Sequence, residues 1–405
     1  MSKGLGEALF DSFDIKCIIL SLNIGLKAKY VEVTNMAESN EIQAQGENMS
    51  QRSTELDHEA DEDLKEILET RKAEIKVIGV GGAGGNTISR MTQVGIVGAE
   101  SIAVNTDAQD LLYTDADEKL LIGREITQGL GAGADPEIGG EAAEESKQDI
   151  KEKLGSSDMV FVTCGLGGGT GTGAAPVVAE TAQKIGALTV GIVTLPFTME
   201  GKQRRANARR GLERLENAVD TLIVIPNDKL LEIVPDVSVT TAFKVADEIL
   251  VNAVKGIAEL VTKPGLVNLD FADIKAVMKS GGLAMIGMGE SDTENRSLEA
   301  VEKALTNPLL DVDIEGADGA LINVTGGPDS TISEAQEIVE AVSNKLHDEA
   351  KVIWGSQIVE ELGESIRTML IVTGVKSSQI YGPKKKYTEE KQREIEKILG
   401  IEFVE

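Results

Sequence analysis

Residues 164–176, CGLGGGTGTGAAP, combine six glycines and two threonines and contain neither a lysine nor an acidic residue. The stretch follows the apolar run MVFVT and leads into a segment with a helical pattern. Glycine costs backbone entropy on folding and adds no side chain to a core, so this density indicates backbone that turns sharply or approaches a ligand closely. Two interpretations remain: a flexible turn, or a loop whose backbone N–H groups cradle phosphate.

A second glycine-rich stretch, GVGGAGGN at residues 79–86, follows another apolar run. Its Gly79, Gly81 and Gly84 match the G-x-G-x-x-G pattern of dinucleotide-binding turns, which is a weak signal on its own. A Rossmann site has no need of another glycine loop, so two of them indicate two walls of one phosphate pocket. No G-x-x-x-x-G-K-[ST] sequence occurs, which excludes a P-loop NTPase.

Both stretches lie at the ends of strand-length apolar runs that alternate with helix-length amphipathic segments. Such alternation predicts a mostly parallel sheet covered by helices on both faces. Ligands bind outside the carboxyl ends of the strands in such sheets, which is where the glycine stretches fall. The predicted strands are IKVIGV (75–80), SIAVN (101–105), MVFVTC (159–164), LTVGIVT (188–194) and TLIVIP (221–226).

A long amphipathic pattern follows, from Ser238 to Lys263, and predicts a helix of about 24 residues, or roughly 36 Å. Pro264 and Gly265 end it. The remaining pattern indicates a second, smaller α+β domain. Its predicted strands lie within residues 281–290, 319–327, 351–358 and 367–375, and its predicted helices around 298–305 and 332–346.

Composition limits the function classes. The 405 residues are enough for two or three domains, and a net charge of -28 opposes binding to nucleic acid or to anionic membrane. Two cysteines argue against a disulfide framework and for a reducing compartment. No apolar run reaches the roughly 18 residues of a membrane span. The run at 15–26 is a weak signal peptide, and one hypothesis is that translation starts downstream, at Met36 or Met49.

Seven motifs in order resemble FtsZ, the tubulin-related GTPase of cell division. They are VGGAGGN, AVNTDAQ, GLGAGADPEIG, GGGTGTGAAPVVAE, PFTMEGKQRR, IPNDKLL and NLDFADI, and the resemblance extends from about residue 75 to residue 375. It implies the tubulin/FtsZ fold, an α/β Rossmann-like parallel-sheet GTPase domain joined by a long central helix to a smaller α+β domain. The expected parts are an N-terminal extension, largely disordered with a lead-in helix (1–72), the GTP-binding domain (73–239), the central helix (240–263), the C-terminal domain (264–376) and a tail (377–405).

The resemblance implies that the ligand is GTP or GDP, with Mg²⁺ bound through the nucleotide phosphates and no metal site of the protein's own. Thr170 and Thr172 would add hydroxyl donors where a lysine is absent, and ordinary helix N-capping is a second, compatible explanation for them. The residues expected around the phosphates are Gly82, Ala83, Gly84, Gly85, Asn86, Asn105, Asp107, Ala132, Gly133, Ala134, Gly168, Gly169, Thr170, Gly171 and Thr172.

The resemblance also implies a base and ribose site. Glu200 and Arg204 match contacts on the ribose and base side, and Asn227 and Asp247 match positions that bind the guanine edge. A carboxylate suits the N1–H and N2–H donors of guanine as a paired acceptor. Phe243 is placed to stack on the base, although a core position on the long helix explains it as well. Bacterial members usually carry Asn in place of the aspartate, so the chain resembles the archaeal type.

Catalysis needs groups that the glycine loops lack. Asn268, Asp270 and Asp273 match the family's synergy loop, which inserts into the nucleotide site of the next subunit. Two aspartates three residues apart at a helix start lie on one face, where they could hold and polarise a water near the γ-phosphate. An aspartate of pKa about 3.9 is a weak base, so orientation and charge placement are expected to dominate. Acids that favour a helix dipole are the competing explanation.

The implied partner is a second copy of the chain. A nucleotide pocket at one end and carboxylates at the other build head-to-tail filaments, here those of the cytoplasmic division ring at mid-cell, and make hydrolysis depend on assembly. No nucleic-acid partner and no membrane insertion are expected. The terminal segment IEKILGIEFVE either docks a membrane-tethering partner or is a frayed helix. Two other classes stay open: a nicotinamide-dependent oxidoreductase, and a filament protein that binds nucleotide without turnover.

Overall fold

The computed structural model describes residues 73–375 except 234–237, 264–266, 268, 280, 311–313 and 315. The expectations for the N-terminal extension, for the tail and for Asn268 therefore lie outside the described residues.

The described residues form one ten-stranded sheet in the order β3-β2-β1-β4-β5-β6-β7-β10-β8-β9. Neighbours from β3 to β7 are parallel, β10 is antiparallel to β7 and to β8, and β8 is parallel to β9. The strands are β1 (Ile75–Val80), β2 (Ala99–Asn105), β3 (Glu118–Leu121), β4 (Met159–Gly165), β5 (Leu188–Leu195), β6 (Thr221–Pro226), β7 (Gly282–Ser291), β8 (Gly319–Gly326), β9 (Lys351–Ile358) and β10 (Ile366–Thr373). All nine predicted strands are confirmed, and β3 is an addition.

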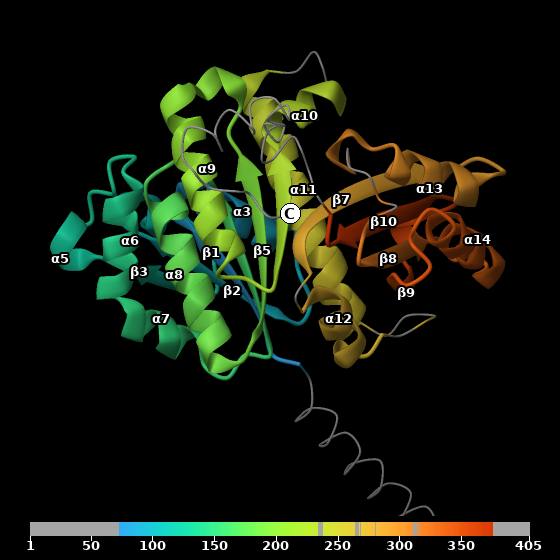
Figure 1. The fold of residues 1–405 in the computed structure, drawn as a ribbon, viewed down its shortest axis with the longest axis horizontal. Coiled ribbons are helices and arrows are strands. Elements are labelled where there is room, and N and C mark those ends of the chain that lie inside the picture. The colour runs from blue at the N-terminus through green and yellow to red at the C-terminus, as the bar shows by residue number, and fades with distance from the viewer. Residues whose placement is uncertain are drawn as a thin grey trace, which may run out of the picture. The chain divides into compact units, whose positions relative to one another are not determined.

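Helices cover both faces of the sheet. Side chains of α6–α9, α13 and α14 join one hydrophobic core, and those of α3 and α10–α12 join the other. Figure 1 shows α8 in front of the strands and α3 behind them. The helices are α3 (Gly81–Val94), α4 (Ala108–Tyr113), α5 (Arg124–Thr127), α6 (Pro136–Glu145), α7 (Lys147–Leu154), α8 (Thr170–Ile185), α9 (Lys202–Glu216), α10 (Asn227–Ile233), α11 (Val239–Thr262), α12 (Phe271–Met278), α13 (Arg296–Leu305) and α14 (Ile332–Ser343).

Burial on both faces explains the continuous apolar runs of the central strands. In β1, Val77 packs into the core under α3 and α11, whereas its neighbour Ile78 packs into the core under α8. Successive strand residues point to opposite faces, so a strand covered twice needs apolar residues throughout.

The predicted long helix is confirmed as α11, of 24 residues. Ser238 caps its start through a bond from the Thr241 backbone N–H. At its other end, the Thr262 hydroxyl donates to the Val97 carbonyl, 2.9 Å away, in the connection before β2. Because β2 begins only at Ala99, α11 ends at the amino edge of the sheet.

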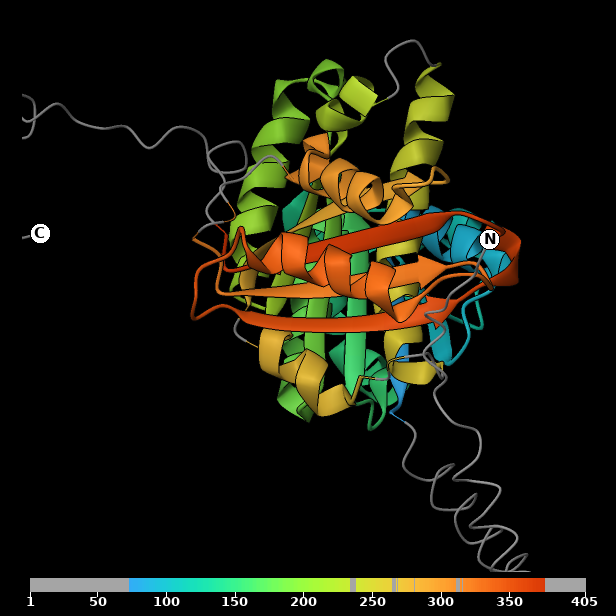
Figure 2. The same cartoon turned by 90° about the vertical axis from the view of Figure 1, so that its right-hand side faces the viewer.

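The second half of the chain continues the same sheet through three paired residues of β6 and β7. Figure 2 shows strands β8–β10 running across the strands of the first half. Arg296 holds this half together: it is buried and binds Asp329 at 2.9 Å, Glu334 at 2.7 Å and the carbonyl of Glu364. The Arg296 guanidinium lowers the pKa of Glu334 below its ordinary value.

Candidate functional site

The sheet order 3-2-1-4-5-6 places a topological switch between β1 and β4. From β1 the chain winds outward to β3, and from β4 it winds in the opposite direction to β6. Crevices form outside the carboxyl ends of the two strands at such a switch. The two glycine-rich stretches follow these two strands, so the fold brings both to one crevice.

The two stretches are in backbone contact. We call residues 79–86 the first glycine loop and residues 165–172 the second. Gly81 has a φ of 72°, and a Cβ there would lie 2.8 Å from the nitrogen of Gly171. A Cβ on Gly165 would lie 2.7 Å from the side chain of Ala83. Only glycine permits these approaches, so the glycines are required for packing of one loop on the other.

Hydroxyl groups fix the shape of the second glycine loop. The Thr172 side chain is buried, and its oxygen accepts a bond from the Gly167 N–H at 2.8 Å. The Thr170 and Thr106 hydroxyl oxygens are 2.7 Å apart and tie the loop to the end of β2. Neither threonine caps a first-turn amide of α8, which begins at Thr170 with no side-chain cap. The first N–H groups of α8 consequently remain available to an anion.

The residues after β2 line the same crevice. The buried Asn105 donates through Nδ2 to Asp110 at 2.7 Å, and a Cβ on Gly82 would lie 3.2 Å from that carboxylate. The Asp107 carboxylate caps α4 by accepting from the N–H groups of Gln109 and Asp110. The sequence motif identified Asn105 and Asp107 but not Asp110, for which the spacing N-x-x-x-x-D was the available signal.

Residues 131–134, the third loop of the crevice, adopt left-handed backbone at Gly131, Gly133 and Ala134. Ala134, with a φ of 60°, is one of two non-glycine residues with positive φ among those the structure describes. A Cβ on Gly169 would lie 2.8 Å from the Ala132 side chain, so this loop packs directly on the second glycine loop.

Polar and aromatic side chains gather after β5 and β6. Asn227, the first residue of α10, is only 4% exposed, and its Oδ1 has no hydrogen-bond partner. Phe243 is 40% exposed, so the core interpretation of this residue is wrong. Its ring meets that of Phe197 edge to face, with centroids 5.2 Å apart. Glu200 and Arg204 form an ion pair of 2.8 Å.

Asp247 faces the first glycine loop from α11. Thr87 donates to its Oδ1 at 3.4 Å and to the Ala83 carbonyl at 3.1 Å. Burial raises the pKa of Asp247 to about 6; the Thr87 bond lowers it and the neighbouring Glu248 charge raises it further. A half-buried carboxylate without a cation is a strong acceptor for paired N–H donors.

The remaining predicted catalytic residues lie elsewhere. Asp270 is the N-cap residue of α12, yet its side chain caps no amide, and Asp273 is exposed in the first turn. Met278, at the end of α12, accepts a bond from the hydroxyl of Thr221, which is the first residue of β6. The helix therefore lies at the amino edge of the parallel strands, and Figure 1 shows it at the end opposite α10. Within one molecule, the carboxylates do not reach the crevice.

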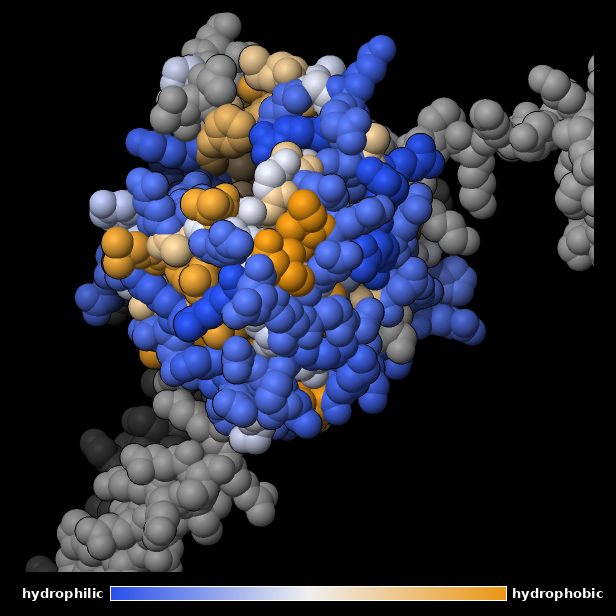
Figure 3. Space-filling view, turned by 90° about the vertical axis from the view of Figure 1, so that its left-hand side faces the viewer, coloured by the Kyte–Doolittle hydropathy of each residue, from blue (hydrophilic) through white to orange (hydrophobic). Residues whose placement is uncertain are grey.

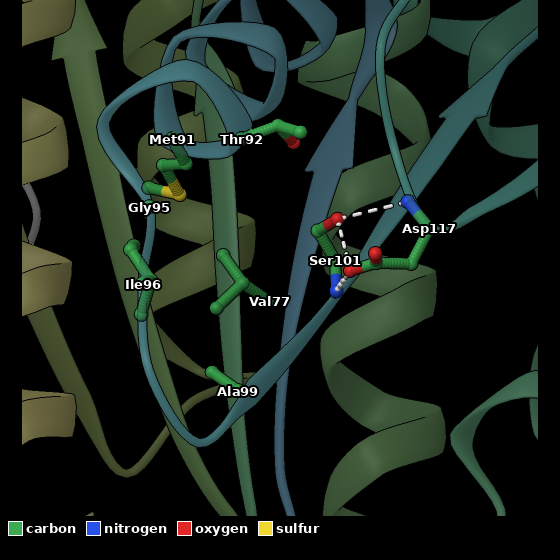
Figure 4. A pocket seen from close by; sticks show the side chains of 8 residues that line it. All are labelled: Val77, Met91, Thr92, Gly95, Ile96, Ala99, Ser101 and Asp117. Carbon is green, nitrogen blue, oxygen red and sulfur yellow. Dashed lines mark hydrogen bonds between the residues drawn. The ribbon is translucent and has the colours of Figure 1, made fainter.

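A cavity of about 150 Å³ lies beside the end of α3, where Ser101 and Asp117 bond each other at 2.7 Å and leave its polar atoms paired (Figure 4). In the ranges that the structure covers, no group of three or more His, Cys, Asp or Glu side chains could hold a metal ion. None of the described helices is long and apolar enough to cross a membrane.

The crevice offers groups that can bind an anion and a hydrogen-bond donor. Its floor is glycine backbone packed loop against loop, α8 begins beside it, and the Oδ1 of Asn227 has no hydrogen-bond partner. A phosphate chain on the loops, with a base between Phe243, Asn227 and Asp247, would satisfy each of these groups.

Two family models match the chain: "Tubulin/FtsZ family, GTPase domain" over residues 74–235 and "FtsZ family, C-terminal domain" over residues 282–376. Cell division protein FtsZ 1 of Thermococcus kodakarensis is 65% identical over 317 residues, which cover 78% of this chain and 85% of that protein. FtsZ 1 of Methanocaldococcus jannaschii is 61% identical and covers the same share of this chain and 87% of its own length.

Solved structures agree with this match. An empty FtsZ dimer of M. jannaschii has a TM-score of 0.75 at 61% identity and covers 78% of this chain and 92% of its own. CetZ1 of Haloferax volcanii, a GDP-bound monomer, has a TM-score of 0.66 at 28% identity over 80% of this chain and 99% of its own. The match across both domains leaves the oxidoreductase interpretation without support. The chain belongs to the tubulin/FtsZ family and, within it, is an FtsZ-type cell division GTPase.

Proposed function

We propose that this GTPase binds guanine nucleotide across the carboxyl edge of the sheet, with the base at β5 and β6 and the terminal phosphate near β2 and β3. The order of the strands supports this direction of the nucleotide, from its base at β6 to its terminal phosphate at β2. Asn227 and Phe197 follow β6 and β5, the glycine loops follow β4 and β1, and residues 131–134 attach to the end of β2 through the Gly131 N–H and the Thr106 carbonyl, 3.1 Å apart. Strands are about 4.8 Å apart, so the β5-to-β2 distance of roughly 14 Å suits an extended triphosphate.

The phosphates would be held by N–H groups of both glycine loops and of α8. Mg²⁺ suits this arrangement as an ion carried by the phosphates, because it retains several waters and needs only one or two protein carboxylates or amides. On the β2 side, Asn105 and Asp110 bond each other beside Gly82 of the first glycine loop, and the Asp107 carboxylate lies beside Gly131 of the third loop. When bound, the cation would neutralise charge that develops on the phosphates.

Hydrolysis would be completed by a neighbouring molecule. The crevice contains Asp247, whose pKa is raised, at its base end. The predicted catalytic carboxylates, Asp270 and Asp273, lie outside the crevice, at the opposite edge of the sheet. When copies stack head to tail, the α12 carboxylates of one copy enter the crevice of the next and orient water at the terminal phosphate. The position of α12 is the observation that carries this proposal.

Exposed apolar side chains support self-association at the carboxyl edge. Leu130 is 82% exposed beside the third loop, Met199 is 70% exposed after β5, and Phe243 lies near the start of α11. Figure 3, which looks at the molecule from the side of α5–α7, shows separate hydrophobic groups on an otherwise hydrophilic surface. Apolar groups that border a polar crevice are typical of a contact surface. Because the two joined faces differ, the contact repeats without closing, and filaments result.

A mixing experiment tests the completion of the site in trans. Asp270→Ala keeps the crevice and loses a carboxylate, whereas Gly81→Val keeps α12 and disrupts the packing of the two glycine loops that form the crevice. We expect each variant alone to release little phosphate from GTP, and an equimolar mixture to recover a substantial part of the parental rate. Asp292→Ala, an exposed acid outside α12, is the control and should leave the rate unchanged. Parental turnover by Asp270→Ala alone, or no recovery in a mixture that co-sediments as filaments, contradicts the proposal.

In the cell, we place these filaments in the cytoplasm at mid-cell, as the division ring. Residues 377–405 would dock a partner that tethers the ring to the membrane. Deleting residues 388–405 should leave polymerisation with GTP intact and abolish recovery of the ring with membrane fractions; unchanged recovery dismisses the tail as the tether.

A further inference from the structure

Asn207 is a buried amide on a helix that the sequence presents as a charged, solvated face. It is 2% exposed, within the run RRANARR of α9. All of its hydrogen-bonding positions are occupied. Oδ1 accepts from Arg210 at 2.9 Å and from Gln203 at 3.3 Å, and Nδ2 donates to the carbonyls of Ala134 at 3.3 Å and Gly167 at 3.4 Å. A fully paired buried amide holds its partners in fixed relative positions.

The two carbonyls belong to different loops of the crevice. Gly167 is in the second glycine loop, with a φ of 108°, and Ala134 ends the third loop, with a φ of 60°. Gly167 uses backbone that glycine adopts freely, whereas Ala134 adopts a conformation that is costly for a residue with a Cβ and persists only where the surroundings enforce it. Asn207 is the one side chain that the described contacts show bonded to both loops.

We propose that Asn207 is a positioning residue that sets the third loop against the second glycine loop and thereby tunes the grip on the terminal phosphate. This inference rests on the proposed direction of the nucleotide, in which residues 131–134 lie at the terminal-phosphate end. α9 begins beside Arg204 and Glu200 at the base end, so Asn207 links a helix anchored at one end of the ligand to the loop at the other. The residue itself touches no nucleotide.

Loss of the Asn207 contacts should affect the affinities for GTP and GDP differently. GDP ends before the third loop, so a displaced third loop should cost it little. GTP reaches that loop. Loss of the two bonds that set the third loop against the second glycine loop should weaken GTP binding by about tenfold, because one hydrogen bond changes an affinity by roughly twofold to tenfold. A purely structural role would weaken both nucleotides alike.

The test compares GTP and GDP binding to the full chain and to Asn207→Leu and Asn207→Asp. Leucine has a volume similar to that of asparagine but makes none of its hydrogen bonds. Aspartate keeps the shape of the side chain but replaces the Nδ2 donor group with an acceptor oxygen that faces the Ala134 and Gly167 carbonyls. Asn217→Leu is the matched control: it is the same substitution at the C-cap of the same helix, at an exposed amide that donates to the Glu213 carbonyl of that helix. Fluorescent analogues of both nucleotides serve as the probes, and thermal melting shows that each variant is folded.

The expected result is a fall of about tenfold in GTP affinity and less than threefold in GDP affinity for both Asn207 variants, with no change for Asn217→Leu. Equal losses for GTP and GDP, or no loss in folded variants, overturn the inference. If the parental protein fails to bind either nucleotide, the proposed site itself is wrong, which is a separate outcome. If Asn207→Leu does not fold, Asn207→Asp decides alone.

Discussion

Lowering the pH from 7 to 5 should weaken guanine binding through Asp247. Its pKa of about 6 makes it about nine-tenths ionised at pH 7 and about one-tenth ionised at pH 5. Only the ionised carboxylate accepts from both N1–H and N2–H of guanine. The apparent affinity should therefore fall by about tenfold over this range, whereas an aspartate of ordinary pKa would leave it nearly constant.

Phosphate groups of the nucleotide also titrate, so Asp247→Asn is the reference. Its amide oxygen keeps one acceptor, and the ratio of parental to variant affinity cancels the contribution of the phosphates. Equilibrium binding of a fluorescent GDP at pH 5, 6, 7 and 8 supplies this ratio. It should be roughly tenfold larger at pH 7 than at pH 5.

Proton release gives an independent check. At pH 6 about half of the free molecules carry a proton on Asp247, and binding of guanine should expel it. Calorimetry in two buffers of different ionisation enthalpy should therefore report release of about half a proton more for the parental protein than for the variant. Parallel affinity profiles for the two proteins, with equal proton release, would refute the role of the carboxylate in reading the base.

Three further predictions concern stability and the loops. Because burial raises the folded-state pKa of Asp247 from its ordinary 3.8 to about 6, the nucleotide-free protein loses stability as the pH rises from about 4 to 6, and the loss is complete at pH 7. The melting temperature of Asp247→Asn should therefore rise relative to that of the parent between pH 4 and pH 7. Gly81→Ala should abolish nucleotide binding, since its Cβ meets Gly171, whereas Gly95→Ala, with a similar φ of 74° and open space, should cost only about 1–2 kcal/mol in urea unfolding and keep binding. Arg296→Met should lower the free energy of unfolding by about 3 kcal/mol through unpaired carboxylates, and Arg367→Met, which breaks an exposed pair with Glu290, by less than about 1 kcal/mol.

Much of the fold was predictable because its strands are buried on both faces. β1, β4 and β6 are mostly apolar along their length, and α11 carries a periodic pattern over its whole length. β3 was missed, because EKLL is four residues long, charged and half-exposed at the sheet edge, and no periodicity develops over that length. Pairing of β6 with β7 rests on three residues brought together across the whole of α11, and local pattern contains no signal of it.

The candidate site, like the fold, was only partly predictable from the sequence. Glycine density, which is local, identified both glycine loops. Side chains from distant parts of the chain complete the site, and local pattern did not reveal their contacts. Asp247 accepts a bond from Thr87 next to the first glycine loop, and Asn207 donates to the third loop. Sequence alone left Phe243 between a core position and a stacking position, since a helical apolar stripe does not reveal its own width; exposure of the ring decides against the core.

The length of α11 bears on the spacing of subunits in a filament of this protein. The helix begins just after α10 at the carboxyl edge and ends beside Val97 at the amino edge, so its 24 residues, about 36 Å, measure the separation between the pocket and the α12 end. Copies joined through those two edges would repeat along the axis at no less than about this spacing. The length of one helix inside a single molecule thus gives a lower limit for the subunit repeat of the polymer.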